Sequence, residues 1–140
     1  MSDILHHIED GVLTLTLNRV AKKNSLTAAM YAELADRLQA AHTDKAVRVI
    51  LIQGHETVFS AGNDLADFMH APPADTDSPV FRFLSAISTC PKPLVAAVCG
   101  PAVGIGSTLL LHCDLVVAGD NAAFSLPFVN LGLCPEAASS

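Results

Sequence analysis

Apolar residues recur along this chain at two spacings, one typical of strands and one typical of helices. Residues 12–17 interleave valine and leucine with threonine, and this partial alternation predicts a strand. Apolar residues between Met30 and Ala41 recur at helical spacing with charged side chains between them, so we expect an amphipathic helix capped by Thr27. Residues 47–52 form a nearly continuous apolar run, which suits a strand covered on both faces.

Strands and helices continue to alternate over the rest of the chain. Further elements are expected in this order: a short strand reaching Phe59, a helical turn or two over 64–70, a polar proline-rich loop over 71–79, a helix over 80–88, a buried strand over 94–99, a helix over 107–112, another strand over 115–118 and an extended piece from Phe124. This order favours an α/β fold over an all-α bundle or an all-β sandwich. Nothing marks an internal boundary, so we expect one domain over residues 1–140.

Charge and the amino-terminal residues narrow the class of function. The net charge of −6 is spread along the chain, and no run of lysine and arginine could neutralise a phosphate backbone, which argues against a nucleic-acid partner. The start of the chain lacks the basic segment and apolar core of a secretory signal, so we expect a cytoplasmic protein. Residues 94–119 are apolar, but glycines, prolines, His112 and Asp114 interrupt them, so we expect buried strand, turn and helix and no membrane partner.

Residue types that bind metals show no matching pattern. The four cysteines lack Cys-x-x-Cys pairing and lie in apolar surroundings, so we expect reduced, packed thiols. The histidines are scattered, and His112 on an apolar helix is more typical of a packed histidine than of a general base. We therefore expect no metal site.

Two glycine-containing turns follow predicted strands, at residues 59–64 and 100–106. Glycine permits backbone angles that other residues avoid, and the first N–H groups of a following helix have no partner within it. If the two turns lie side by side, the N–H groups of Asn63 and Ile105 would point at one oxygen and stabilise an enolate or a tetrahedral oxyanion. Spacing alone fits two unrelated tight turns at least as well.

Whole motifs make these turns more specific. Phe-Ser-Ala-Gly-Asn-Asp-Leu at 59–65, Pro-Lys-Pro-Leu-Val-Ala-Ala-Val at 91–98, Gly-Pro-Ala-Val-Gly at 100–104 and Cys-Asp at 113–114 follow one another as in the enoyl-CoA hydratase/isomerase family, which the chain resembles over nearly its whole length. The resemblance implies a crotonase-like spiral of ββα units, an acyl-CoA thioester partner, no metal or other cofactor, and a homotrimer or hexamer. Members of that family continue further, so it also implies a chain truncated at its C-terminus, without the family's C-terminal helical part and with exposed apolar surface.

Departures from the family pattern select among its reactions. The positions of the two glutamates that hydratases use hold Thr108 and Phe128, which argues against water addition by a glutamate pair. Asn63 and Glu136 instead resemble the Δ3,Δ2-enoyl-CoA isomerase branch, in which one glutamate carries a proton between the α and γ carbons. On this interpretation Glu136 removes the γ (C4) proton and returns it at the α carbon, while the N–H groups of Asn63 and Ile105 hold the dienolate oxygen. We expect burial among residues 133–135 to favour the neutral acid of Glu136.

Further positions are carried over from the family as substrate-binding residues: Lys22, Ser60, Ala61, Gly62, Asn63, Asp64, Leu65, Gly104 and Ile105. Ile105 stands at the middle position of the family's usual Gly-Gly-Gly, which keeps the N–H but adds a side chain. Lys22 lies where the family passes close to the coenzyme A phosphates, although a solvated lysine fits equally well. Asp64 is interpreted as a helix cap more readily than as an acid.

Other interpretations stay open on the sequence. If the family resemblance is set aside, the sequence favours interpreting Glu136 as a solvated carboxylate in a loop. The chain could be hydratase-like, or a catalytically inactive truncated module that binds coenzyme A thioesters or only oligomerises. A thioester hydrolase lacks a residue to activate water, and a dinucleotide-binding fold does not fit the spacing of Gly100, Gly104 and Gly106.

Overall fold

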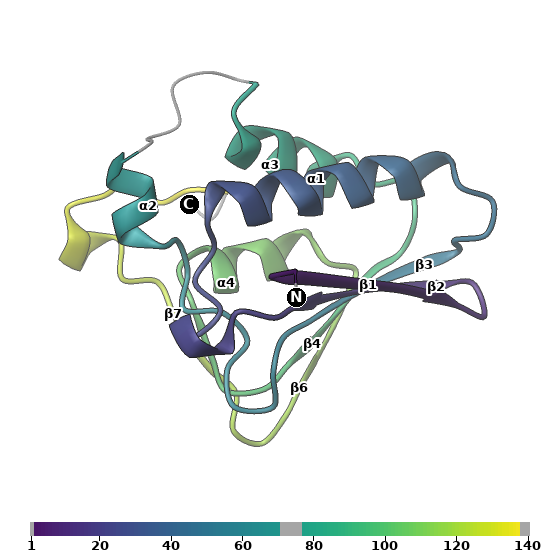
Figure 1. Ribbon diagram of the computed structural model, residues 1–140. Helices are drawn as coiled ribbons and strands as arrows, with labels where there is room; N and C mark the ends of the chain where they lie inside the picture. Colours follow the sequence, from purple (N-terminus) through teal and green to yellow (C-terminus); the bar gives the residue numbers. More distant parts are fainter. Residues whose placement is uncertain (1, 71–76, 138–140) are drawn as a thin grey trace.

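The structure, a computed structural model, describes residues 2–70 and 77–137 (Figure 1). Short 3₁₀ turns are labelled η. In chain order the elements are β1 (Ile4–Glu9), β2 (Val12–Leu17), η1 (Val20–Lys22), α1 (Ala28–Thr43), β3 (Val49–Gln53), α2 (Leu65–His70), α3 (Pro79–Ser88), β4 (Leu94–Val98), β5 (Pro101–Val103), α4 (Ile105–Thr108), η2 (Leu109–His112), β6 (Leu115–Ala118), β7 (Ala123–Ser125) and η3 (Val129–Leu131). Most of the loop expected over 71–79 lies outside the described residues.

Two sheets organise these elements. The larger sheet has the strand order β1-β2-β3-β4-β6, in which β1 is antiparallel to β2 and the other neighbours are parallel. β5 and β7 form a second, parallel pair. Parallel neighbours joined by helices confirm the α/β fold class predicted from the sequence, and the recurrence of two extended segments followed by a helix is the predicted spiral of ββα units.

The core lies between the larger sheet and the helices α1 and α3, which lie side by side above it (Figure 1). Alternate residues of β2, β3 and β4 enter this core, and the residues between them are only half-buried. The apolar run that predicted a strand covered on both faces therefore gives, in β3, a strand with one fully covered face. Thr27 caps α1 as predicted, because its side chain accepts the Met30 N–H at 3.2 Å.

Two local predictions were wrong. The segment reaching Phe59 is no regular strand: His55 and Val58 close a tight turn on each other, and Ser60 makes an isolated bridge to Ala102. Residues 100–106 are not one turn either, because β5 runs through them and pairs with β7. Both segments take their conformation from partners distant in the sequence, which local patterns do not reveal.

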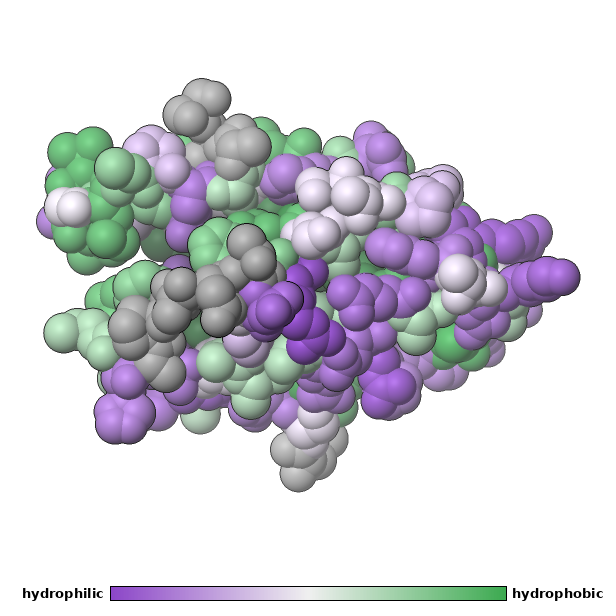
Figure 2. Space-filling model, turned by 90° about the horizontal axis from the view of Figure 1, so that it is seen from above, coloured by the Kyte–Doolittle hydropathy of each residue, from purple (hydrophilic) through white to green (hydrophobic). Residues whose placement is uncertain are grey.

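Large apolar side chains are exposed on two parts of the surface, as expected from the resemblance. One group lies on and beside β6 and β7 and includes Leu115, Val117 and Phe124. The other lies on α2 and η3, and Figure 2 shows hydrophobic residues gathered toward this end of the molecule and hydrophilic ones toward the opposite end. In the described residues, no helix is both long and apolar enough to cross a membrane.

Candidate functional site

The loop after Phe59 and the segment that begins α4 cross each other, and their main chains are in contact at the crossing. Gly62 has a φ of 93°, and a Cβ there would lie 2.8 Å from the Val103 carbonyl oxygen. A Cβ on Gly106 would lie 2.8 Å from the Ser60 carbonyl oxygen, which also accepts the Val103 N–H at 2.9 Å. The two glycine segments singled out in the sequence are therefore side by side, and a side chain at either glycine would force them apart.

Two main-chain N–H groups at this crossing, those of Asn63 and Ile105, have no acceptor in the described part of the chain. The N–H groups on either side of Asn63, and the one before Ile105, all donate to protein oxygens. Almost all backbone N–H groups away from water find an acceptor, so two free donors at one place indicate a position for a ligand oxygen.

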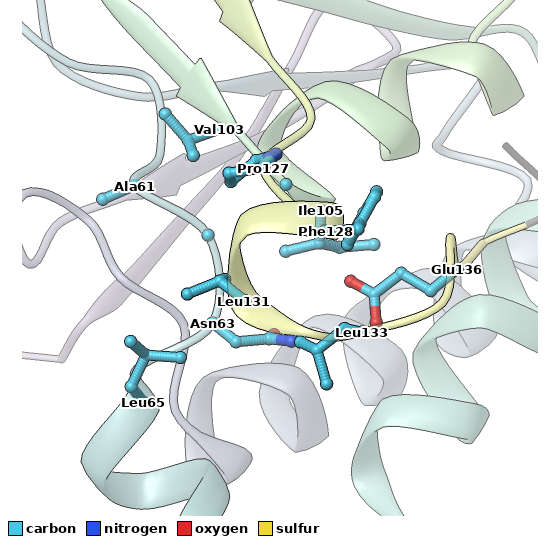
Figure 3. A pocket seen from close by; sticks show the side chains of 12 residues that line it. Ala61, Asn63, Leu65, Val103, Ile105, Pro127, Phe128, Leu131, Leu133 and Glu136 are labelled. Atoms are coloured by element: carbon cyan, nitrogen blue, oxygen red, sulfur yellow. The ribbon is translucent and has the colours of Figure 1, made fainter.

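Asn63 and Ile105 line one cavity of about 130 Å³, together with Glu136 (Figure 3). The other lining residues are apolar side chains or glycines: Ala61, Gly62, Leu65, Val103, Gly104, Pro127, Phe128, Leu131 and Leu133. Of the lining residues described, only Asn63 and Glu136 carry polar side chains. An apolar cavity with few polar groups is typical of a small-molecule site.

Glu136 faces this cavity from the segment after η3 (Figure 3). Burial raises the pKa of its carboxyl group above the usual value, because the charged form loses solvation. The predicted direction is confirmed. Of residues 133–135, Leu133 lines the cavity beside Glu136, and the other apolar residues of the cavity wall add to its low-dielectric surroundings.

His112 fixes the backbone next to Glu136. Its Nε2 atom lies 2.8 Å from the carbonyl oxygen of Ala137, which has a φ of 54°. This half-buried side chain therefore connects η2 to the segment that carries the carboxylate, a contact that the interpretation as a packed histidine did not include.

Some of the remaining predicted substrate-binding positions line the cavity, and others lie outside it. Ala61, Gly62, Leu65 and Gly104 line the cavity, as stated above. Ser60 is buried behind it: its hydroxyl donates to the Asn24 carbonyl at 2.9 Å and accepts the Gly62 N–H at 3.1 Å. Lys22 is exposed on η1 and Asp64 is half-buried, and neither lines the cavity.

The two positions used by hydratase glutamates lie in different places. Phe128 lines the cavity and is 6 % exposed, whereas Thr108 is fully buried and does not line the cavity. A carboxylate therefore reaches the cavity from residue 136 and from neither of these positions.

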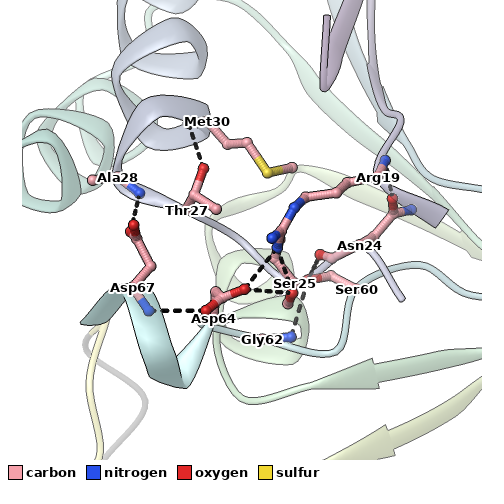
Figure 4. A network of polar contacts seen from close by, with 10 residues as sticks. All are labelled: Arg19, Asn24, Ser25, Thr27, Ala28, Met30, Ser60, Gly62, Asp64 and Asp67. Carbon is pink, nitrogen blue, oxygen red and sulfur yellow. Dashed lines mark hydrogen bonds and ion pairs between the residues drawn. The ribbon is translucent and has the colours of Figure 1, made fainter. Parts of the chain in front are cut away.

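Asp64 supports the site loop through a network that Figure 4 shows. Its Oδ1 atom accepts the Asp67 N–H at 2.9 Å, which confirms the predicted cap at the start of α2, and its Oδ2 atom pairs with Arg19 Nη1 at 2.8 Å. Ser25 approaches the same carboxylate. These contacts, first the Asp67 N–H and then Arg19, lower the pKa of Asp64. The end of β2 is thereby joined to the residue after Asn63.

Asp64→Asn tests this network through pH. A carboxyl group whose pKa is lowered on folding stabilises the fold above its ordinary pKa, and this stabilisation is lost as pH falls through the pKa of the folded state. We expect the free energy of unfolding of the wild-type chain to fall with acidification over that range, and the Asp64→Asn variant to show a shallower fall. Urea unfolding at stepped pH measures both slopes, and equal slopes would contradict the role of the charge.

Three supporting residues were not singled out from the sequence. Arg19 is one, through its pairing with Asp64. Asn24, fully buried with a φ of 55°, accepts the Arg19 N–H at 2.7 Å and donates to the Phe59 carbonyl at 3.1 Å. Tyr31 on α1 donates its hydroxyl hydrogen to Asn63 Oδ1. An asparagine in a polar connection is a weak signal for a left-handed residue, and the other two give no local signal.

Known proteins are similar to this chain in sequence and in fold. Residues 7–140 match the enoyl-CoA hydratase/isomerase family, and the chain belongs to that family. It is 42 % identical to 2,3-dehydroadipyl-CoA hydratase of Escherichia coli over 98 % of this chain, and 40 % identical to human enoyl-CoA delta isomerase 2 over 94 % of it. The structure of Pseudomonas aeruginosa OdaA is similar with a TM-score of 0.95 and 56 % identity over 98 % of this chain. These matches confirm the crotonase-like fold.

The chain spans only part of each of these proteins. It covers 54 % of the E. coli hydratase, 35 % of the human isomerase and 56 % of the OdaA chain. Relatives at similar identity carry both hydratase and isomerase names, so identity does not choose between the two reactions.

Proposed function

We propose that this chain carries the site of a Δ3,Δ2-enoyl-CoA isomerase, which moves a double bond into conjugation with an acyl-CoA thioester. The observation that carries the proposal is the cavity that brings Glu136 together with the free N–H groups of Asn63 and Ile105. One carboxylate and two N–H donors are the groups that this reaction needs, and the proposal requires no metal or other cofactor.

The proposed reaction starts with the acidic hydrogen of the substrate. In a 3-enoyl thioester this hydrogen is at C2, between the carbonyl and the double bond. Glu136 removes it, the C–H electrons form a dienolate, and the N–H groups of Asn63 and Ile105 hold the enolate oxygen. The protonated Glu136 then delivers the hydrogen to C4, which leaves a double bond between C2 and C3. The order expected from the sequence, with C4 first, belongs to the reverse direction and is corrected on this ground.

The environment of Glu136 supports both halves of this cycle. A carboxylate with a raised pKa is a stronger base than an exposed one, and it holds the proton during the lifetime of the dienolate. The apolar side chains of Phe128, Leu131 and Leu133 line the same cavity and offer water few hydrogen-bond partners there. Water addition needs a second group to activate water, and Phe128 stands where a hydratase carries a glutamate, which favours isomerisation over hydration.

Conversion of a 3-enoyl-CoA tests the proposal, since the conjugated 2-enoyl product is detected by its ultraviolet absorbance. We expect absorbance to rise with 3-enoyl-CoA and to stay constant when 2-enoyl-CoA is supplied in water. Loss of absorbance with 2-enoyl-CoA would support a hydratase instead. Binding of acyl-CoA without turnover of either thioester would support the second candidate, a binding module.

The partners and setting of the protein belong to the same proposal. An acyl-CoA thioester is the proposed ligand, with Lys22, Ser60 and Asp64 as supporting positions whose contact with it stays a prediction. A homotrimer or hexamer, expected from the family, would cover part of the apolar surface on β6 and β7. Light scattering on the purified protein measures that assembly. The cytoplasmic setting also stays a prediction.

A further inference from the structure

Tyr31 connects the longest helix to the candidate site. It lies on α1, is 2 % exposed, and packs its ring against Phe83 with 5.4 Å between ring centroids. Its hydroxyl donates to Oδ1 of Asn63, which lines the cavity and whose main-chain N–H has no acceptor among the described residues. Tyr31 was not among the site residues predicted from the sequence, and the proposed reaction does not use its hydroxyl.

The buried phenol acts only as a neutral group. Burial, and secondarily the charge of Glu136, raises the pKa of Tyr31 well above its usual value, so the hydroxyl keeps its proton. That proton needs an acceptor, and in the described part of the chain Asn63 Oδ1 accepts it. If the Asn63 amide were flipped, its nitrogen would donate to the phenol oxygen and the buried O–H would lose its acceptor. Tyr31 therefore favours one of the two amide orientations.

Asn63 lines two cavities, so its side-chain amide has a different neighbour on each side. Tyr31 lines a small cavity beside α1 with Leu26 and Phe68, and Asn63 lines both this cavity and the one that contains Glu136. With Oδ1 turned toward Tyr31, the Nδ2 hydrogens are left for the other side. Figure 3 shows the Asn63 side chain extending toward the segment of Leu133 and Glu136, with its nitrogen at the tip.

We propose that Tyr31 is a positioning residue whose hydroxyl orients the Asn63 amide, so that Nδ2–H and the main-chain N–H of Asn63 both face a bound thioester. The catalytic part of this inference rests on the proposed isomerase function. A flipped amide would present Oδ1, with its lone pairs, to an oxygen that becomes negative during the reaction, which opposes catalysis instead of assisting it.

Tyr31→Phe removes the hydroxyl and keeps the ring packed against Phe83. We expect kcat for 3-enoyl-CoA to fall about tenfold, as for loss of one buried hydrogen bond, with KM little changed. Phe83→Leu is the matched control, because it disturbs the same ring pair and leaves the hydroxyl in place. It should lower the melting temperature without lowering kcat.

A double-mutant cycle with Asn63→Ala shows whether Tyr31 acts through the amide. In the Asn63→Ala background, Tyr31→Phe should have no further effect on kcat. Independent, additive losses would overturn the proposal, as would an unchanged kcat in the folded Tyr31→Phe variant of an active protein.

The side-chain amide resonances of Asn63 test the orientation without any turnover. In the wild-type protein we expect one sharp pair of Hδ2 signals, and in Tyr31→Phe a shifted or broadened pair with faster hydrogen exchange. Unchanged Asn63 signals would overturn the positioning role. If the wild-type protein fails to convert 3-enoyl-CoA while the Asn63 signals still respond to Tyr31→Phe, the proposed function fails and the orientation of Asn63 by Tyr31 stands.

Discussion

Glu136→Gln is expected to lower kcat for isomerisation of a 3-enoyl-CoA by about 10²- to 10⁴-fold, the range typical of a general acid or base. The amide keeps the size of the carboxyl group but neither accepts nor delivers a proton at C2 and C4. Acyl-CoA affinity should change little, because the cavity wall and the N–H groups of Asn63 and Ile105 are untouched. Single-turnover kinetics and a thioester binding isotherm measure the two effects separately.

Glu56→Gln is the matched control, since Glu56 is exposed and does not line the cavity. It should retain wild-type turnover. Undiminished turnover in Glu136→Gln would contradict the proposed base and return Glu136 to the interpretation as a solvated loop carboxylate. Equal losses in both variants would show that the effect is not specific to the cavity.

The raised pKa of Glu136 also sets the pH profile. As a base it must be ionised, so log(kcat/KM) should rise with pH and level off above the raised pKa. Stability should change in the opposite direction. A carboxyl group whose pKa is raised on folding contributes stability that is lost as pH rises through that pKa, so Glu136→Gln should remove this loss and leave the variant folded at neutral pH. A lower melting temperature for the variant at neutral pH would contradict the burial argument.

The sequence predicted the layout of the fold better than its local connections. Helical spacing and capping located α1 and its cap Thr27 correctly, since both depend on residues within one or two turns. The segment near Phe59 and the strand β5 were misjudged, because Ser60 pairs with Ala102, and β5 pairs with β7 some twenty residues further along the chain. Such pairings are decided by tertiary neighbours, which periodicity does not contain.

For the candidate site, too, the sequence predicted local features and missed those that depend on distant neighbours. Glycines mark sharp turns in a sequence, and motif order identified the two that meet, although spacing alone left them unrelated. The sequence predicted free N–H groups at Asn63 and Ile105 only on the condition that the two turns lie side by side, because whether these groups lack acceptors depends on where neighbouring donors find theirs. Tyr31 was invisible for a similar reason: its position on the helix predicts burial, and only the approach of Asn63 gives its hydroxyl a partner.

Ile105→Pro is expected to remove one of the two proposed oxygen-binding donors and to lower kcat/KM by about 10²- to 10³-fold, close to 3 kcal/mol of transition-state stabilisation. Ile105 is the first residue of α4, after Gly104. Proline is well tolerated at this position of a helix, because its fixed φ suits the helix and the N–H it lacks has no helical partner. The substitution therefore deletes the N–H while the backbone path is retained.

Ile105→Ala separates the donor from the side chain. Ile105 is 1 % exposed and part of the core, so both variants lose packing and should melt at lower temperature than the wild type. Assayed below those melting temperatures, Ile105→Ala keeps the N–H and should retain most of the activity that Ile105→Pro loses. Equal losses in the two variants would assign the effect to packing.

Ligand binding provides a second readout of the same donor. An acyl-CoA thioester has the carbonyl oxygen that the Ile105 N–H is proposed to bind, and an alkyl thioether of coenzyme A has none. Ile105→Pro should weaken binding of the thioester and leave binding of the thioether close to that of Ile105→Ala. If both ligands weaken equally, the N–H of Ile105 does not contact the carbonyl oxygen, and the pairing of Asn63 with Ile105 as oxygen-binding donors is wrong.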